Sequence, residues 1–425
     1  MSKTLAVLAL FASLFLQISP SEAATFEAGQ QRANPVVQWN RALLVIVRTP
    51  GAQPATVHPT RSFALMHAAI YDAVNAIERT HRPYLVHLAH APRHASQDAA
   101  AAAAGHRILT ELYPAFEEML DAELERSLEP IPEGRAKAEG IRIGQAVAER
   151  ILSLRSDDGS GAEPIPYIFG ENPGDYQSTP PNFPPQPQFT HWPFVAPFVL
   201  PSADRFRSEA PPSLASQQYA DDFNEVKLLG VVDSTKATPE EMLIGRFWNG
   251  PIQNYWNEII QTAVLSHQLN TARSARLFAL VDLAIADGVI AFYDAKYAYN
   301  FWRPVTAIRA ADPNINPETL PDPDWLPEVT NTAPDPSYPG AHAVISSIAA
   351  TVLIELLERD HFVFDVTSEV LPGAERHFTR ISDAREEAAA SRIFAGQHFR
   401  FDEDAGQLLG HRVAEFAVHH VLLER

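Results

Sequence analysis

Residues 61–78 read RSFALMHAAIYDAVNAIE, and this stretch indicates the fold class. Its apolar residues recur at three- and four-residue spacing, which is the period of one face of an α-helix; they are Phe63, Met66, Ala69, Ile70, Ala73, Val74 and Ile77. Similar patterns predict helices at 99–112, 134–154, 272–301, 341–358, 382–394 and 404–423. Because strand-like alternation is scarce, the sequence predicts an all-α protein.

A further helix is predicted from its start signal. Thr238 is placed to cap the helix, Pro239 falls in the first turn, and Glu241 completes a capping box. These three residues predict a helix that begins at position 239.

Two stretches cannot continue this helical pattern. Residues 164–212 contain 13 of the 35 prolines together with many aromatic residues, which predicts an irregular arm packed over a helical core. Residues 312–339 hold eight prolines and six acids but no basic residue. We expect a single helical domain at 24–425, with N-terminal helices and the proline-rich arm at 24–212 and a helical core at 213–425.

The first 23 residues are typical of a signal peptide. Lys3 precedes an apolar stretch at 5–18, and Ser21-Glu22-Ala23 forms a cleavage site flanked by small residues. The apolar stretch is shorter than the roughly 18–20 residues that span a bilayer. We therefore expect cleavage after Ala23 or Ala24, and a secreted or periplasmic protein without a membrane span.

Composition excludes several classes of site and partner. The chain has no cysteine, which excludes disulfides, thiolate metal sites and cysteine nucleophiles. Its formal net charge is −19, and such a surface repels phosphate backbones, so nucleic acid is not an expected partner. The hydrophobic fraction of 46% is that of a globular protein with ample core.

Three short segments in the last third of the chain carry candidate chemistry. The first is KYAYNFWRP at 296–304. On a continuous α-helix, Lys296 and Arg303 differ by about 20° in direction and would share one face. Because aromatic residues lie between them and an apolar run precedes them, we expect both cations to be buried and to bind an anion.

The second segment is SYPGAHA at 337–343, which leads into an apolar helix. The backbone N–H groups of Gly340 and Ala341 at that helix start are expected to point at an anion. His342 then falls in the first turn, where we expect a lowered pKa suited to acid–base catalysis.

The third segment is SRIFAGQH at 391–398. Arg392 can bind an oxyanion through its guanidinium, and His398 can act as a nucleophile or metal ligand. On an unbroken helix the two side chains would diverge, but Gly396 offers a break. Asp402 is a candidate acceptor for the His398 ring, or else a surface acid.

Together these segments resemble the pattern K-x6-RP, PSGH and SR-x5-H of the vanadium-dependent haloperoxidases and of the type 2 phosphatidic acid phosphatase superfamily that shares their fold. The phrases MHAAIYDAVNAI (66–77), ADDFNEVKLLG (220–230), DAKYAYNFWRPVTAIR (294–309) and SRIFAGQHFRFD (391–402) are also similar to secreted bacterial members. The resemblance implies the helical-bundle fold of these enzymes.

The resemblance also implies a role for each matched residue. Lys296, Arg303 and Arg392 would neutralise the equatorial oxygens of vanadate, or of phosphate in a phosphatase. His398 would be the axial vanadium ligand, or the residue that a phosphatase phosphorylates. His342 would be the acid–base group. The implied reaction is oxidation of halide by hydrogen peroxide, with halide, peroxide and an organic acceptor as small-molecule partners.

One departure concerns the second segment. The serine and glycine that precede the family's histidine are Gly340 and Ala341 here. The loss of the serine hydroxyl removes a hydrogen bond to the oxyanion, so a Gly340→Ser substitution is expected to tighten anion binding. A soluble acid phosphatase on the same residues, and a non-catalytic oxyanion-binding protein, are the alternatives. All three readings predict that Lys296, Arg303, His342, Arg392 and His398 converge.

Overall fold

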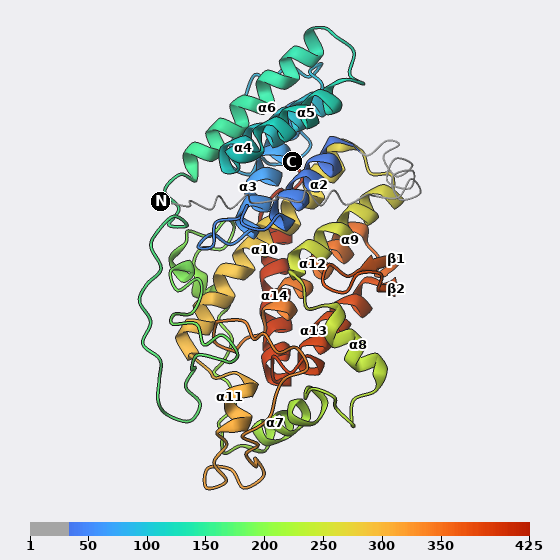
Figure 1. Cartoon of the computed structure of the whole chain (residues 1–425). Coiled ribbons are helices and arrows are strands. Elements are labelled where there is room, and N and C mark those ends of the chain that lie inside the picture. Colours follow the sequence, from blue (N-terminus) through green and yellow to red (C-terminus); the bar gives the residue numbers. More distant parts are fainter. Residues whose placement is uncertain (1–33) are drawn as a thin grey trace, which may run out of the picture. The chain divides into compact units, whose positions relative to one another are not determined.

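Helices make up most of residues 34–425, the part of the chain that the computed structural model describes (Figure 1). This confirms the predicted all-α fold class. The predicted signal peptide at 1–23 lies outside the described residues. Among the described residues, no helix is both long and apolar enough to cross a membrane.

The α-helices of this region follow one another along the chain, and the longest connections contain the two proline-rich stretches. The helices are α2 (Pro35–Arg48), α3 (Thr60–Glu78), α4 (Gln97–Leu112), α5 (Glu117–Leu128), α6 (Arg135–Leu154), α7 (Gln217–Leu229), α8 (Pro239–Phe247), α9 (Ile252–Ser266), α10 (Thr271–Tyr299), α11 (Pro304–Arg309), α12 (Ala341–Leu357), α13 (Ile381–Phe394) and α14 (Arg400–His420). A 3-10 turn, η1 (Pro114–Phe116), precedes α5. The capping box of Thr238 and Glu241 at the start of α8 is confirmed.

Helices α3, α4 and α6 form one packed group, in which α4 lies between the other two (Figure 1). The alanines at 99–104 of α4 are all buried. On α6, a Cβ atom at Gly144 would lie 2.9 Å from the Cβ of Ala103, so the glycine allows the two backbones to approach closely. Helix α3 also packs against α10, which connects this group to the rest of the protein.

Helix α12 packs against α14 and α10 in the centre of Figure 1. Every residue of α12 from Ala343 to Leu353 is buried, so this part of the helix has no solvent-exposed face. Gly406 and Gly410 of α14 lie directly against the α12 backbone. This close packing positions the N-terminal turns of α12 and α14 beside each other.

A two-stranded antiparallel sheet was not expected from the sequence. It consists of β1 (His361–Thr367) and β2 (Glu375–Arg380). Alternate residues of β1 are buried, and β1 packs against α9. Because the period-two pattern covers only one short strand, it is weak against the helical patterns on either side.

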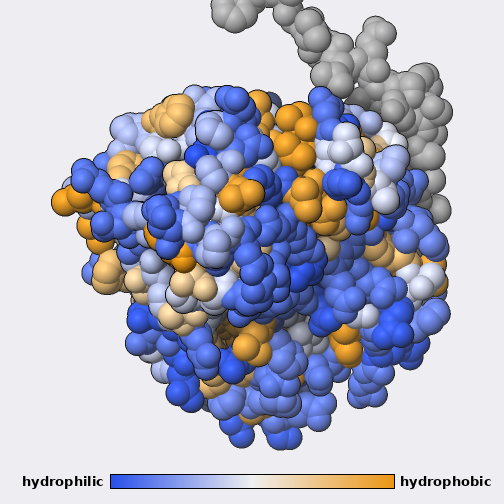
Figure 2. All heavy atoms as spheres, turned by 90° about the horizontal axis from the view of Figure 1, so that it is seen from below, coloured by the Kyte–Doolittle hydropathy of each residue, from blue (hydrophilic) through white to orange (hydrophobic). Residues whose placement is uncertain are grey.

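The proline-rich arm at 164–212 contains no α-helix but two 3-10 turns, η2 (Trp192–Phe194) and η3 (Ala203–Phe206). The buried carboxylate of Asp287 in α10 accepts backbone N–H groups of Phe198, Val199 and Leu200 at 2.5–2.7 Å. Trp192 is buried as well. The arm is therefore packed on the helical core, as predicted. Figure 2 shows a face on which hydrophilic residues predominate and apolar ones form separate patches.

Candidate oxyanion site

Lys296 and Arg303 lie on either side of a helix end rather than on one helix. Helix α10 ends at Tyr299, because Asn300 adopts the left-handed conformation with φ 50°. Arg303 has an extended backbone and precedes Pro304, the first residue of α11. The expected helix to position 301 and the shared helical face are therefore wrong. Both side chains are nevertheless buried, and the tertiary fold brings them together.

The two cations meet at Asp335, which the sequence analysis did not single out. Oδ1 of Asp335 lies 3.2 Å from Nζ of Lys296 and also contacts Nη2 of Arg303. Burial alone would raise the pKa of Asp335, but the charges of Lys296 and Arg303 outweigh it and hold the pKa below its usual range. Burial lowers the pKa of Lys296 to about 8. The only signal of Asp335 in the sequence was an acid between two prolines, shortly before Gly340.

His398 joins this pair of cations because the chain turns sharply after α13. Gly396 has a φ of 74°, so the break predicted at this glycine is confirmed. Nε2 of His398 lies 2.9 Å from Nη1 of Arg303, while Nδ1 lies 3.0 Å from Oδ2 of Asp402. Asp402 is fully buried, which rules out the surface reading of this acid. The ring thus directs Nε2 toward the cations.

Aromatic packing positions the segments that carry these side chains. Phe301 and Phe399 belong to one buried cluster, and their ring centroids are 6.0 Å apart. Phe399 also stacks on Phe401 at 4.9 Å. Since Phe301 precedes Arg303 and Phe399 follows His398, the cluster ties together two segments that lie almost a hundred positions apart.

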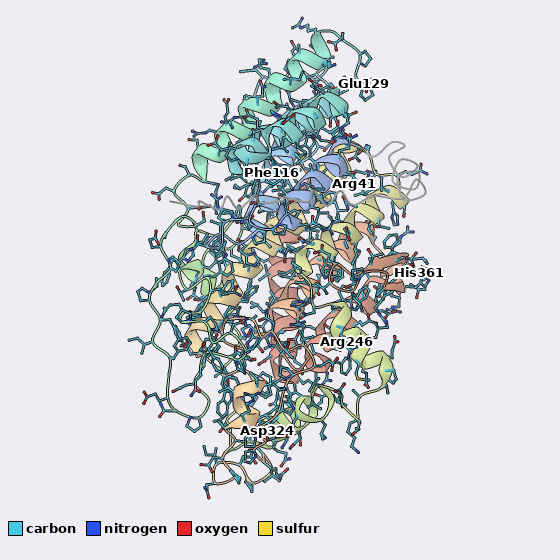
Figure 3. The ribbon with its side chains drawn as sticks, viewed as in Figure 1. Arg41, Phe116, Glu129, Arg246, Asp324 and His361 are labelled. Carbon is cyan, nitrogen blue, oxygen red and sulfur yellow. The ribbon has the colours of Figure 1, made fainter. Side chains whose placement is uncertain are left out.

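Arg392 approaches from the last turn of α13. Its Nη1 donates to Oδ1 of Asn249 at 3.1 Å, just after α8. Figure 3 marks this end of α8 with Arg246. Nε of Arg392 is buried and has no acceptor within the described part of the chain. A buried guanidinium N–H without an acceptor is a donor available to a bound anion.

The second segment is placed as expected, with one correction. Helix α12 begins at Ala341, and Gly340 caps it. The N–H of Gly340 donates to the carbonyl of Asp402 at 2.8 Å, so it is not available to an anion as the sequence analysis expected. The N–H of Ala341 has no acceptor among residues 34–425 and stays available. His342 keeps part of its surface exposed and lies 3.0 Å from the Trp248 carbonyl through Nε2.

Both histidines are held in the neutral form. Burial lowers the pKa of His398 well below its usual range, and the charges of Arg303, Lys296 and Arg392 act in the same direction. Burial also lowers the pKa of His342, followed by the charge of Arg392. The structure therefore gathers all five side chains that the three sequence segments contributed.

The sequence of this chain is similar to those of known proteins. A family model described as the second helical-bundle domain of VCPO matches residues 276–423, the range that contains all five side chains. Vanadium chloroperoxidase from Curvularia inaequalis is 25% identical over an alignment of 499 residues, which covers 90% of this chain and 81% of that protein. Residues 276–423 thus match the second helical-bundle domain of VCPO, and the chain as a whole is similar to vanadium haloperoxidases.

Solved structures of vanadium haloperoxidases share the fold. The structure described as the first bacterial vanadium-dependent iodoperoxidase has a TM-score of 0.77 and 24% identity, and the match covers 92% of this chain and 96% of that one. A holo-type bacterial vanadium-dependent chloroperoxidase has a TM-score of 0.66 and 16% identity, with 93% and 98% covered. The similarity extends over nearly the whole described chain.

Glu403 is a second acid of this site that the sequence analysis missed. It follows Asp402 in the first turn of α14 and is 2% exposed. One of its carboxyl oxygens lies 3.7 Å from Nδ1 of His398. Neither oxygen has a hydrogen-bond partner within the described residues. No pattern marked it, because an acid in the first turn of a helix is an ordinary capping feature.

Proposed function

We propose that this chain is a vanadate-dependent haloperoxidase that oxidises halide with hydrogen peroxide. The observation that carries the proposal is that Nε2 of His398 lies 2.9 Å from Nη1 of the buried Arg303, with the charges of Lys296 and Arg392 close enough to lower the pKa of the His398 ring. Buried cations are costly unless an anion compensates them. Asp335 pairs with Lys296 and Arg303, whereas Arg392 forms no salt bridge within the described residues.

The donor set of the site fits vanadate. Nε of Arg392 and the N–H of Ala341 are donors without an acceptor in the described chain, and both belong to the cluster around His398. Lys296, Arg303 and Arg392 would hold the oxygens of the anion, and Nε2 of His398 would be the single protein ligand of vanadium. When bound, vanadate supplies a Lewis-acid centre for peroxide without a change of oxidation state.

The protein residues would position the cofactor and move protons. Asp402 accepts from Nδ1 of His398 and thereby leaves the lone pair on Nε2. Nε2 of His342 contacts the Trp248 carbonyl as a donor, which leaves Nδ1 as the basic nitrogen. A neutral, partly exposed imidazole can accept a proton from hydrogen peroxide, and we assign this role to His342.

The proposed partners are small molecules: hydrogen peroxide, a halide and an organic acceptor. The acidic charge of −19 argues against a nucleic-acid partner. Export by the N-terminal segment 1–23 is part of the proposal and rests on the sequence alone.

The test uses protein freed of metal by a chelator, with and without added orthovanadate. Two activities are measured: peroxide-dependent bromination and phosphomonoester hydrolysis. We expect no bromination without vanadate and its appearance on addition, because vanadate is the cofactor. A phosphatase would instead hydrolyse the phosphoester and be inhibited by vanadate, which imitates the transition state of phosphoryl transfer.

His398→Ala supplies the control, since it removes the proposed vanadium ligand and must abolish the bromination. Vanadate-inhibited hydrolysis without bromination would overturn the proposal in favour of the phosphatase. The absence of both activities would favour the non-catalytic oxyanion-binding protein.

A further inference from the structure

The proline-rich arm reaches the oxyanion site through Gln188. Nε2 of Gln188 donates to Oδ2 of Asp335 at 2.9 Å and has a longer contact of 3.4 Å with the Tyr293 hydroxyl. The backbone N–H of Gln188 donates to the Pro334 carbonyl at 2.8 Å, and its carbonyl accepts the Tyr297 hydroxyl. Because these two backbone contacts dock the arm here, the side-chain amide is not needed to hold the arm in place.

The two oxygens of the Asp335 carboxylate have different neighbours. Oδ1 lies 3.2 Å from Nζ of Lys296 and contacts Nη2 of Arg303. Oδ2 accepts the amide of Gln188 instead. A carboxylate can also bind an arginine with both oxygens at once, as a bidentate pair. The Gln188 amide competes with that arrangement, because it holds Oδ2 on the side of the arm.

Acceptors of the protein take most N–H groups of the two cations. Nζ of Lys296 contacts the carbonyls of Pro336 and Ser337 as well as Oδ1 of Asp335. An ammonium has three N–H groups, so these acceptors account for all of them. Arg303 donates from Nε to the Asp335 carbonyl at 2.9 Å and from Nη2 to its Oδ1. An oxyanion that binds Lys296 must therefore displace an acceptor, and Asp335 is the charged acceptor that both cations share.

We propose that Gln188 is a positioning residue for the bound oxyanion. By holding Oδ2, it keeps the Asp335 carboxylate from turning both oxygens toward Lys296 and Arg303. The carboxylate then stabilises the two buried cations but still yields to the anion. This role rests on the proposed function, because it concerns the same anion. It gives the arm at 164–212 a part in anion affinity that its packing on the helical core does not require.

Calorimetric binding of orthovanadate and of inorganic phosphate tests this role without relying on turnover. Gln188→Met keeps the length of the side chain but removes the N–H donor, so Oδ2 of Asp335 has to find a donor on the cations. We expect both anions to bind about three- to tenfold more weakly, which is the usual effect of one hydrogen bond.

Gln186→Met is the matched control from the same arm. Oε1 of Gln186 accepts the backbone N–H of Tyr167 at 2.7 Å, and Nε2 donates to the Tyr167 carbonyl at 3.2 Å. Gln186 thus connects two parts of the arm, and its side-chain hydrogen bonds do not involve Asp335. A general loosening of the arm would weaken anion binding in this variant too, whereas we expect the affinity of the wild type.

A double-mutant cycle with Asp335→Asn separates positioning from a merely structural role. Asp335→Asn removes the competing charge, so both anions should bind more tightly than to the wild type. On this background Gln188→Met should change the affinity by less than about twofold, since no carboxylate is left to position. Thermal unfolding shows whether each variant is folded. If Asp335→Asn is not, the comparison of Gln188→Met with Gln186→Met decides.

Four results would overturn the proposal. The first is a Gln188→Met variant that binds the anions as tightly as the wild type or more tightly. The second is an equal loss in Gln186→Met. The third is an undiminished effect of Gln188→Met on the Asp335→Asn background, and the fourth is weaker binding by Asp335→Asn itself. If the wild type binds neither anion, the proposed function fails, and the role of Gln188 fails with it.

Discussion

Nδ1 of His398 lies 3.0 Å from Oδ2 of Asp402, and both side chains are buried. The same carboxylate oxygen accepts the Ser337 hydroxyl and the backbone N–H of Phe399. Asp402 is therefore fixed by its own neighbours, and it in turn fixes the orientation of the His398 ring. This arrangement decides which ring nitrogen faces Arg303.

Asp402→Asn should weaken vanadate binding by about 10- to 100-fold, because groups that orient a metal ligand are worth that much in affinity. The amide can turn its NH₂ group toward the ring and favour the wrong tautomer. Calorimetric titration with orthovanadate measures the effect. Asp404→Asn, exposed and two residues further along α14, is the control. Unchanged affinity in Asp402→Asn would show that the ring is oriented by packing alone.

Asp335→Asn should destabilise the protein without a bound anion, by about 3–5 kcal/mol, because it leaves Lys296 and Arg303 without their buried carboxylate. Added phosphate should restore more stability in the variant than in the wild type, since the anion then compensates the cations. Thermal unfolding with and without phosphate measures both effects.

The control is Asp324→Asn, an exposed position in the same loop (Figure 3). An equal stabilisation of wild type and Asp335→Asn by phosphate would contradict the view that Asp335 and the anion neutralise the same charges.

Asp282→Asn should remove a pH dependence of stability far from the site. Burial raises the pKa of Asp282 to about 8, so the folded state keeps a proton that the unfolded state has already released above pH 4. Stability of the wild type is therefore lost as pH rises from about 4 to about 8, by at most about 1.4 kcal/mol per pH unit.

An asparagine does not titrate, and its oxygen can still accept from Asn257, which donates to Oδ1 of Asp282 in the structure. We expect the free energy of unfolding of Asp282→Asn, relative to that of the wild type, to be higher at pH 8 than at pH 5. Urea unfolding at the two pH values measures this difference. Asp157→Asn, exposed just after α6, should show no such gain. A constant difference between wild type and Asp282→Asn at both values would refute the prediction.

Gly410→Ala should destabilise the packing of α12 on α14. A Cβ there would lie 2.8 Å from Cβ of Ser347 and even closer to the Val344 carbonyl oxygen, which is backbone and cannot rotate away. We expect a loss of about 1–3 kcal/mol, typical of overpacking, although alanine otherwise favours helices. At Gly161 nothing lies within 4 Å of the new methyl group, so Gly161→Ala is the matched control. Equal stability of the two variants in denaturant unfolding would contradict the close packing.

Local patterns were enough to predict most of the helices and the three segments of the site. The periodicity at 61–78 predicted α3, and Thr238 with Glu241 predicted the start of α8. Gly396 marked the turn that lets His398 approach Arg303. These features depend on residues only a few positions apart, so they can be recognised in a single sequence.

The tertiary structure alone determined which side chains of the site contact one another. Asp335 pairs with cations 32 and 39 positions away, and Glu403 fills the space that Gly340 leaves open on another helix. The sequence also suggested that Lys296 and Arg303 share one helix, whereas Asn300 ends that helix and the aromatic cluster brings Arg303 to His398. Steric room and charge neutralisation depend on which segments pack together, and no local pattern contains that information because the contacts join residues far apart in the chain.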